Sequence, residues 1–219
     1  MMSQLFAIDG PSGSGKSTTA KLLAKRLGLG YLDTGAMYRA ATTEYLRRFP
    51  EGAAAGEVSQ LVAEADLVCD TSPDEPCFHI NGHDVTEEIR EPRISAAVST
   101  VATNLEVRRL LTELMRAVID QHGRRIVVEG RDITTVVAPD ADVRVLLVAD
   151  PQARVARRAA EVAGKASAEE VTDQVLRRDR DDSTVSNFTD AAEGVTVIDS
   201  TFLTPDEVVD AIIALAPRA

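Results

Sequence analysis

The chain has 219 residues and a formal net charge of -11 at pH 7, with 27% charged and 44% hydrophobic residues. This length is enough for one domain with its own core and a small insert. An acidic chain lacks the broad positive field that binding to a nucleic-acid polymer requires, so that class of partner is excluded. The apolar runs are too short to cross a bilayer and the first residues show no signal-peptide pattern, which predicts a cytoplasmic protein without a membrane partner.

The strongest motif lies near the start, where residues 10–17, GPSGSGKS, fit the pattern G-x-x-x-x-G-K-[ST]. An apolar run at 4–9 predicts a strand before it, and helical spacing up to Gly28 predicts a helix after it. Glycines let successive N–H groups face one anion, and the helix N-terminus adds positive charge. The motif therefore predicts a phosphate-binding loop in which Lys16 contacts the β- and γ-phosphates and Ser17 ligates Mg²⁺. A glycine-rich turn that binds nothing is the alternative.

The next part of the chain interrupts the alternation of strands and helices. A strand at 30–33 leads through Thr34, a candidate helix cap, into a helix that runs to about residue 48, and another helix is expected near 58–65. Asn81-Gly82 between two short apolar runs is a strong hairpin signal, because both residues tolerate positive φ. A parallel sheet has little use for such a hairpin, so residues 63–93 are predicted to form an inserted antiparallel subdomain.

The insert holds the only two cysteines, Cys69 and Cys77, and free thiols are expected rather than a disulfide. His79 and His83 lie nearby and invite a zinc interpretation. Their spacing matches none of the familiar zinc motifs, and alternating strand faces would separate the side chains. Ordinary strand residues are therefore the preferred interpretation.

Two helices are expected at about 92–102 and 105–121, the second with Asn104 as its N-cap and Gly123 after its end. A buried strand at 126–129 then runs into Gly130-Arg131-Asp132, at the edge where open α/β sheets bind their ligands.

A second buried strand is expected at 143–149, and the arginine-rich residues 150–184 follow it. They predict a helical hairpin, either a lid that closes over phosphates or two solvated helices. A last strand at 195–199 precedes a helix that opens with the capping box Thr204-Pro205-Asp206-Glu207. The order of elements predicts an α/β fold: a five-stranded, mostly parallel sheet wrapped by helices, with the inserted β subdomain and the helical lid.

Four segments together resemble the bacterial cytidylate kinase family: residues 10–17, residues 32–39 (LDTGAMYR), residues 127–132 (VVEGRD) and residues 178–184 (RDRDDST). The similarity runs nearly from end to end, and a hairpin insert is also a trait of the bacterial enzymes. The first segment alone indicates only a P-loop, whereas the other three in this order and separation are much more specific. The resemblance implies a P-loop kinase that transfers a phosphoryl group from MgATP to CMP or dCMP, and we expect a monomer.

The resemblance also implies roles for residues on the acceptor side. Arg39, Arg131 and Arg178 would hold the acceptor phosphate and the transferred group. The cytosine edge would face Ser99, Arg108 and Asp132, and Asp182 would lie near the ribose. The implied substrate-binding residues are Thr34, Arg39, Ser99, Arg108, Arg131, Asp132, Arg178 and Asp182. Family members usually carry Gly where Thr134 stands, Phe at Ala138 and an arginine near Val185, so sugar recognition would depend mainly on Asp182.

On the donor side, the implied catalytic residues are Lys16, Arg131 and Arg178, with Mg²⁺ as the cofactor of ATP. The ATP-binding residues are those of the loop and of the lid: Gly10, Pro11, Ser12, Gly13, Ser14, Gly15, Lys16, Ser17, Thr18, Arg154, Arg157 and Arg158. The attacking phosphate oxygen is already anionic near neutral pH, so positioning and charge neutralisation are expected to replace a general base.

Two other functions stay open. A different P-loop kinase would act on another nucleotide or on a small hydroxylated metabolite, and a nucleotide-dependent switch would bind partners without phosphorylating a metabolite. The guanine-specific pattern Asn-Lys-x-Asp is absent from the chain, which weakens a GTPase-like switch. ADP formation that depends on added CMP separates these functions.

Overall fold

The structure is a computed structural model that describes residues 4–161, 172, 177, 179–181, 183–186 and 188–216. Five strands form the central sheet in the spatial order β2-β6-β1-β7-β8. Their bounds are Gln4–Asp9 for β1, Gly30–Asp33 for β2, Arg125–Gly130 for β6, Val143–Val148 for β7 and Thr196–Asp199 for β8. Every neighbouring pair is parallel, which confirms the predicted sheet and brings the carboxyl ends of the strands to one edge.

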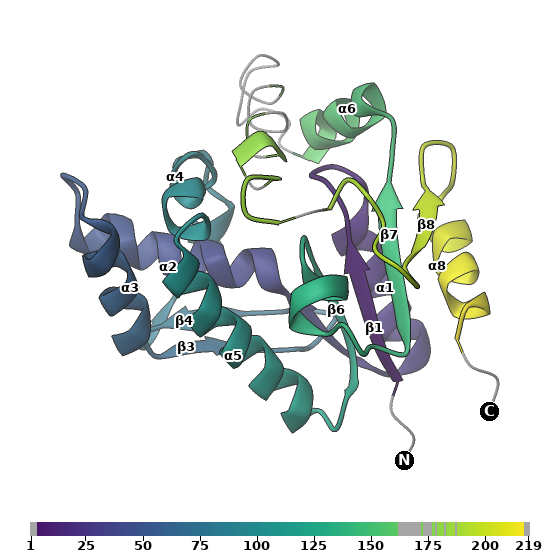
Figure 1. The fold of residues 1–219 in the computed structure, drawn as a ribbon, viewed down its shortest axis with the longest axis horizontal. Helices are drawn as coiled ribbons and strands as arrows, with labels where there is room; N and C mark the ends of the chain where they lie inside the picture. Colours follow the sequence, from purple (N-terminus) through teal and green to yellow (C-terminus); the bar gives the residue numbers. More distant parts are fainter. Residues whose placement is uncertain are drawn as a thin grey trace.

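Helices cover both faces of this sheet, because its buried strands alternate apolar side chains between two clusters. Leu5 and Ala7 of β1 belong to the cluster that includes α2 and α5, whereas Phe6 and Ile8 belong to the cluster that includes α1 and α8. Figure 1 shows the sheet between these two groups of helices. The bounds are Lys16–Leu27 for α1, Thr34–Arg48 for α2, Leu105–Gln121 for α5 and Pro205–Ala214 for α8.

A separate antiparallel sheet of three short strands lies within the predicted insert, in the order β3-β4-β5. The turn between β4 and β5 is Asn81-Gly82, with φ of 51° and 77°, which confirms the predicted hairpin. The elements of this region are α3 Ala55–Glu64, β3 Leu67–Cys69, β4 Phe78–Ile80, β5 His83–Asp84, the 3-10 turn Glu88–Arg90 and α4 Pro92–Ala102. Cys69 and Cys77 are free thiols, and burial raises the pKa of Cys69 to about 11.

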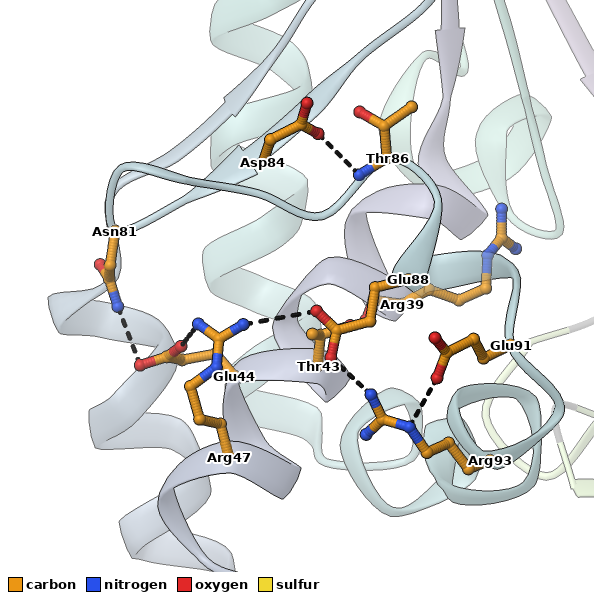
Figure 2. A network of polar contacts seen from close by, with 10 residues as sticks. All are labelled: Arg39, Thr43, Glu44, Arg47, Asn81, Asp84, Thr86, Glu88, Glu91 and Arg93. Atoms are coloured by element: carbon orange, nitrogen blue, oxygen red, sulfur yellow. Dashed lines mark hydrogen bonds and ion pairs between the residues drawn. The ribbon is translucent and has the colours of Figure 1, made fainter.

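Glu44 of α2 joins the hairpin to the main domain (Figure 2). It is only 8% exposed, and its carboxylate accepts hydrogen bonds from Asn81 Nδ2 at 3.1 Å and from Arg47 at 3.0 Å. Arg47 also reaches Glu88 at 3.4 Å, and Glu88 in turn pairs with Arg93 at the start of α4. A buried carboxylate is stable only with such partners, so this network fixes the insert against α2.

Most predicted helix ends are confirmed. Asn104 caps α5 by accepting from the N–H groups of Glu106 and Val107, and Thr204 forms the capping box of α8 with Glu207. The prediction of Thr34 as the cap of α2 is wrong. Asp33 is the N-cap and accepts from Ala36 N at 2.8 Å, because its carboxylate reaches the first turn while the Thr34 hydroxyl donates to Glu129 O.

Two further elements lie at the carboxyl edge of the sheet. Residues Ile133–Val137 form a π-helical turn that the sequence analysis does not predict, and α6, Pro151–Glu161, begins the predicted helical hairpin above β7 (Figure 1). Arg178 and Asp182 lie outside the described residues, as does most of the rest of that hairpin. Within the described ranges, each helix is too short or too polar to cross a membrane.

We predict that Glu44→Ala lowers the free energy of unfolding by about 1–3 kcal/mol, because Asn81 and Arg47 lose a buried acceptor. Glu113→Ala is the matched control. Glu113 forms an exposed pair with Arg109 on α5, so this change should cost at most about 0.5 kcal/mol. Urea denaturation of the three proteins measures both effects, and equal losses in the two variants would contradict the anchoring role of Glu44.

Candidate active site

The loop between β1 and α1 curls at its glycines, as the motif predicts. Gly10 and Gly13 have φ of 151° and 76°, a region that favours glycine. A Cβ atom on Gly10 would lie 2.1 Å from the Leu147 carbonyl oxygen, and one on Gly13 would lie 2.6 Å from that of Arg154. The loop is therefore packed tightly between β7 and α6, and only glycine fits these two positions.

Lys16 and Ser17 begin α1 at the end of this loop. The Lys16 ammonium donates to Pro11 O at 2.8 Å and thus lies across the loop. Burial lowers its pKa to about 8, while the nearby Glu129 carboxylate acts in the opposite direction. Lys16 is still mostly protonated at neutral pH and supplies a positive charge inside the loop.

Ser17 shares a carboxylate with Tyr31 beneath the loop. Its hydroxyl donates to Glu129 Oε1 at 2.5 Å, and the Tyr31 hydroxyl donates to the same oxygen at 3.1 Å. Burial, followed by the charge of Asp33 on the neighbouring strand, raises the pKa of Glu129. A hydroxyl and a carboxylate side by side are oxygen ligands of the kind that Mg²⁺ prefers, so this pair fits the predicted metal position.

Three donors next to the loop converge on one carboxylate. Asp179 accepts from Ser12 N at 3.1 Å, from Arg131 at 2.9 Å and from Arg154 by a short contact. Arg131 and Arg154 are 14% and 9% exposed, and the Arg131 guanidinium also lies 4.5 Å from the ring centre of Phe188. Because these donors already hold an anionic group, they form a site that suits phosphate oxygens.

Two buried polar groups in the described part of the chain have no hydrogen-bond partner, and both lie at this loop. They are the hydroxyl of Ser14 and Nε of Arg154. Leaving such a group unsatisfied costs about 1–3 kcal/mol, and buried polar groups without a partner are therefore unusual in native interiors. The arrangement is typical of a site that is completed by a ligand.

A cleft opens beside this cluster, at the carboxyl end of β6. Residues from α2, α4, α5, the β6 end and the segment 183–186 line it: Thr34, Gly35, Tyr38, Val98, Ala102, Arg108, Gly130, Arg131, Asp132 and Ser186. Four residues of the predicted substrate set are therefore brought together here: Thr34, Arg108, Arg131 and Asp132. Arg131 lines the cleft and is also one of the three donors around Asp179, with Ser12 and Arg154, which together are called the phosphate cluster. It therefore links the cleft to this cluster.

A charged pair forms the polar wall of the cleft. Arg108 donates to Asp132 by a short contact and to Ala102 O at 3.0 Å, and it lies 5.8 Å from the ring centre of Tyr38. The side chains of Arg108 and Asp132 are 14% and 11% exposed. Their orientation is fixed by these contacts, which leaves a donor and an acceptor in fixed positions at the cleft.

Other residues predicted for the two nucleotide sites do not line the cleft. Arg39 pairs with Asp33 at 3.0 Å and does not line the cleft, and the Ser99 hydroxyl donates to Asp181 at 2.8 Å. Arg157 donates to the hydroxyl and carbonyl oxygens of Ser200 and to Thr201 O, and the Ser200 hydroxyl in turn donates to Ser14 O of the loop. Arg158 is carried by α6, and Thr18 is an exposed residue of α1.

Four residues that the structure places at the site have no role predicted from the sequence: Asp9, Glu129, Asp179 and Phe188. Glu129 had a signal, because an acidic residue ends an otherwise apolar strand. Asp9 had the same signal, because it ends the apolar run of the first strand. Asp179 stands among many charged residues, and Phe188 has no distinguishing pattern around it.

Asp9, the last residue of β1, is 1% exposed. Its carboxylate accepts from Ile133 N at 2.8 Å, Thr134 N at 2.8 Å and the Thr134 hydroxyl at 2.6 Å. Burial raises the pKa of Asp9 to about 6, and these hydrogen bonds act in the opposite direction. Thr134, which stands where family members usually carry Gly, thus adds a hydroxyl donor to the buried carboxylate of Asp9.

A parallel sheet with a glycine-rich loop and lysine between its first strand and helix defines a P-loop protein. The family model described as Cytidylate kinase matches residues 6–218. The chain is 55% identical over 214 residues to a protein named Cytidylate kinase from Cutibacterium acnes, covering 97% of this chain and 96% of the relative. A protein of that name from Streptomyces griseus is 40% identical over 215 residues, with coverages of 97% and 92%.

The chain therefore belongs to the cytidylate kinase family, and the prediction of a nucleoside monophosphate kinase is confirmed. Among solved structures, an uncharacterized protein from Eubacterium ventriosum shares the fold, with a TM-score of 0.54 and coverage of 96% of both chains. Its sequence identity of 12% limits that likeness to the fold.

The raised pKa of Asp9 predicts how its contribution to stability depends on pH. The folded protein binds this proton more tightly than the unfolded chain, so the contribution is complete below the usual pKa of 3.8 and is lost as the pH rises through about 6. Relative to Asp9→Asn, the unfolding free energy of the parent should therefore fall by roughly 2–3 kcal/mol between pH 4 and pH 7.

Urea denaturation at several pH values measures this difference. Asp84→Asn is the control, because Asp84 is exposed and hydrogen bonds to Thr86 lower its pKa, so its difference should not fall with rising pH. A parent-minus-variant difference for Asp9 that stays constant or rises over this range would show that the ionised carboxylate carries no burial penalty.

Proposed function

We propose that the chain transfers the terminal phosphoryl group of MgATP to CMP or dCMP, giving ADP and CDP or dCDP. The observation that carries the proposal is the position of Arg131, which belongs to the phosphate cluster at the loop and also lines the cleft with Arg108 and Asp132. A donor phosphate and an acceptor phosphate bound on either side of one guanidinium would lie close together. That proximity is the main requirement of phosphoryl transfer.

The residues at the loop are suited to neutralising charge. N–H groups of the loop, the Lys16 ammonium and the guanidinium groups of Arg131 and Arg154 would face the oxygens of the transferred group. The attacking oxygen of CMP is anionic at neutral pH, so no side chain has to remove a proton. Fixed positive charges that are partly shielded from water stabilise a transition state more strongly than solvated ones do.

Ser17 and Glu129 would hold Mg²⁺, the hydroxyl directly and the carboxylate directly or through water. When bound, the ion would supply positive charge that reduces the repulsion between the phosphate oxygens and the incoming nucleophile. Asp179 would have to leave Ser12, Arg131 and Arg154, or rearrange among them, when phosphate oxygens arrive. Arg39, with Arg178 and Asp182 from outside the described residues, remains in the proposed acceptor set by resemblance.

The pair Arg108 and Asp132 supports cytosine as the base. Cytosine presents an amino donor at N4 and an acceptor at N3, whereas uracil presents the reverse. An ionised Asp132 can only accept and Arg108 can only donate, so together they match cytosine. Uracil would leave buried polar groups unpaired, a penalty that a hydrogen-bonding site imposes strongly on a wrong substrate.

An acceptor panel tests this function. ADP formation from MgATP should depend on added CMP or dCMP, and kcat/KM for UMP should be at least about a hundredfold lower, equivalent to roughly 2.7 kcal/mol. Activity with a hydroxylated metabolite alone would instead indicate a different P-loop kinase. Nucleotide binding without ADP formation for any acceptor would indicate a switch protein.

Arg108 and Arg109 are neighbours on α5 and offer a matched pair of variants. Arg108→Ala removes a donor of the cleft and should lower kcat/KM for CMP by about tenfold or more, a cost of at least about 1.4 kcal/mol. Arg109 is 52% exposed and pairs with Glu106 and Glu113 on its own helix, so Arg109→Ala should leave kcat/KM within about twofold. Steady-state kinetics that give equal values for both variants would remove Arg108 from base recognition.

A further inference from the structure

We infer that Asp9 and Thr134 form a positioning link that holds the Arg131–Asp132 segment against the strand carrying the phosphate-binding loop. The inference rests on the proposed function, because it assigns to this link the spacing between the two substrate sites. Neither residue lines the cleft, and neither hydrogen bonds directly to Lys16, Arg131 or Arg108. Both would therefore act through the residues that they position.

Asp9 lies directly before the phosphate-binding loop. It ends β1 in the centre of the sheet, opposite Gly130 of β6 and Leu146 of β7. The next residue is Gly10, the first of the phosphate-binding loop. The Asp9 carboxylate therefore lies on the strand from which the loop starts, and whatever it binds is held at a fixed distance from that loop.

The segment that Asp9 binds is the π-helical turn Ile133–Val137. All three hydrogen bonds accepted by Asp9 come from Ile133 and Thr134, the first two residues of the π-helical turn that follows Asp132. The turn is closed by bonds from Val136 and Val137 to Asp132 O. Fixing its first two residues from β1 thus fixes the backbone of Asp132 as well.

The π-helical turn is capped by Asp9 and not by its own N-cap residue. The first N–H groups of a helical turn need acceptors, and the residue at the N-cap position usually supplies one through its own side chain. Asp132 occupies that position but makes no side-chain cap bond. Asp9 takes over the capping from another strand, and the Asp132 carboxylate is thereby left to pair with Arg108 in the cleft.

Burying the Asp9 carboxylate costs free energy. Three hydrogen bonds offset only part of the cost of burying the Asp9 charge, as the raised pKa of this group indicates. A neutral residue would impose no such cost. Proteins retain groups of this kind where geometry matters more than stability, and displacements of about 1 Å at a reacting centre can reduce rates by about a hundredfold.

Thr134 allows the link to be tested without altering the strand next to the loop. Thr134→Val removes the hydroxyl with little change in shape, and Thr134→Ser restores it. Thr135→Val is the matched control, because Thr135 is the next residue of the same turn and is exposed. Each protein is assayed for kcat, for KM of CMP and of ATP, and for the ratio of kcat/KM between CMP and UMP, with Tm as a check on folding.

We expect Thr134→Val to raise KM for CMP about fivefold or more and to narrow the CMP to UMP ratio, with KM for ATP within about twofold. Thr134→Ser should return both quantities to within about twofold of the parent, and Thr135→Val should not change them. A loss of stability alone would lower kcat for all substrates together and would leave the ratio unchanged. That result, or equal kinetics for Thr134→Val and Thr135→Val, would overturn the inference.

Asp9→Asn gives a second readout that does not depend on turnover. An Asn side chain cannot accept all three hydrogen bonds, so the amide hydrogens of Ile133 and Thr134 should exchange at least about tenfold faster in the folded variant. Unchanged exchange at both amides would also contradict the link. If the parent itself forms no ADP with CMP, the proposed function fails, whereas an active parent with unaffected Thr134→Val kinetics refutes only the link.

Discussion

The parallel pairing of β1 with β6 and β7 is the constraint on which the site depends. Parallel strands end at the same edge, so the residues that follow β1 and β6 emerge next to each other although more than 100 positions separate them. Gly10 and Arg131 are neighbours for this reason. A change of register by one residue would turn Asp9 and Glu129 to the opposite face and would disrupt both the Ser17–Glu129 hydrogen bond and the cleft.

Charge balance around the loop explains why this edge is stable before any nucleotide is present. Lys16, Arg131 and Arg154 would repel one another if nothing anionic lay between them. Glu129 and Asp179 supply that charge from β6 and from the arginine-rich segment after α6. Their carboxylates satisfy the cations and keep them in place, so the positive charges are held in position before any other anion replaces Asp179.

The sequence allowed the fold and much of the site to be predicted, because local patterns carry that information. Apolar runs identified the strands of the main sheet, Asn81-Gly82 identified the hairpin, and the motif residues Lys16 and Ser17 identified the loop. The π-helical turn after Asp132 was missed because its first N–H groups are satisfied by Asp9, from a strand far away in the sequence. The cap of α2 was misassigned to Thr34 for a similar reason, since the Thr34 hydroxyl donates to Glu129 O on the neighbouring strand β6.

Residue types and their spacing along the chain were enough to predict the glycine-rich loop, the parallel sheet and the likeness to cytidylate kinases. Tertiary structure alone decided which charges meet. It placed Arg108 against Asp132, gathered Ser12, Arg131 and Arg154 around Asp179, and joined Arg157 to the loop through Ser200. Spacing along the chain constrains only neighbours within one element, whereas the partner of a buried charge is set by the packing of separate elements and by the cost of leaving that charge unpaired.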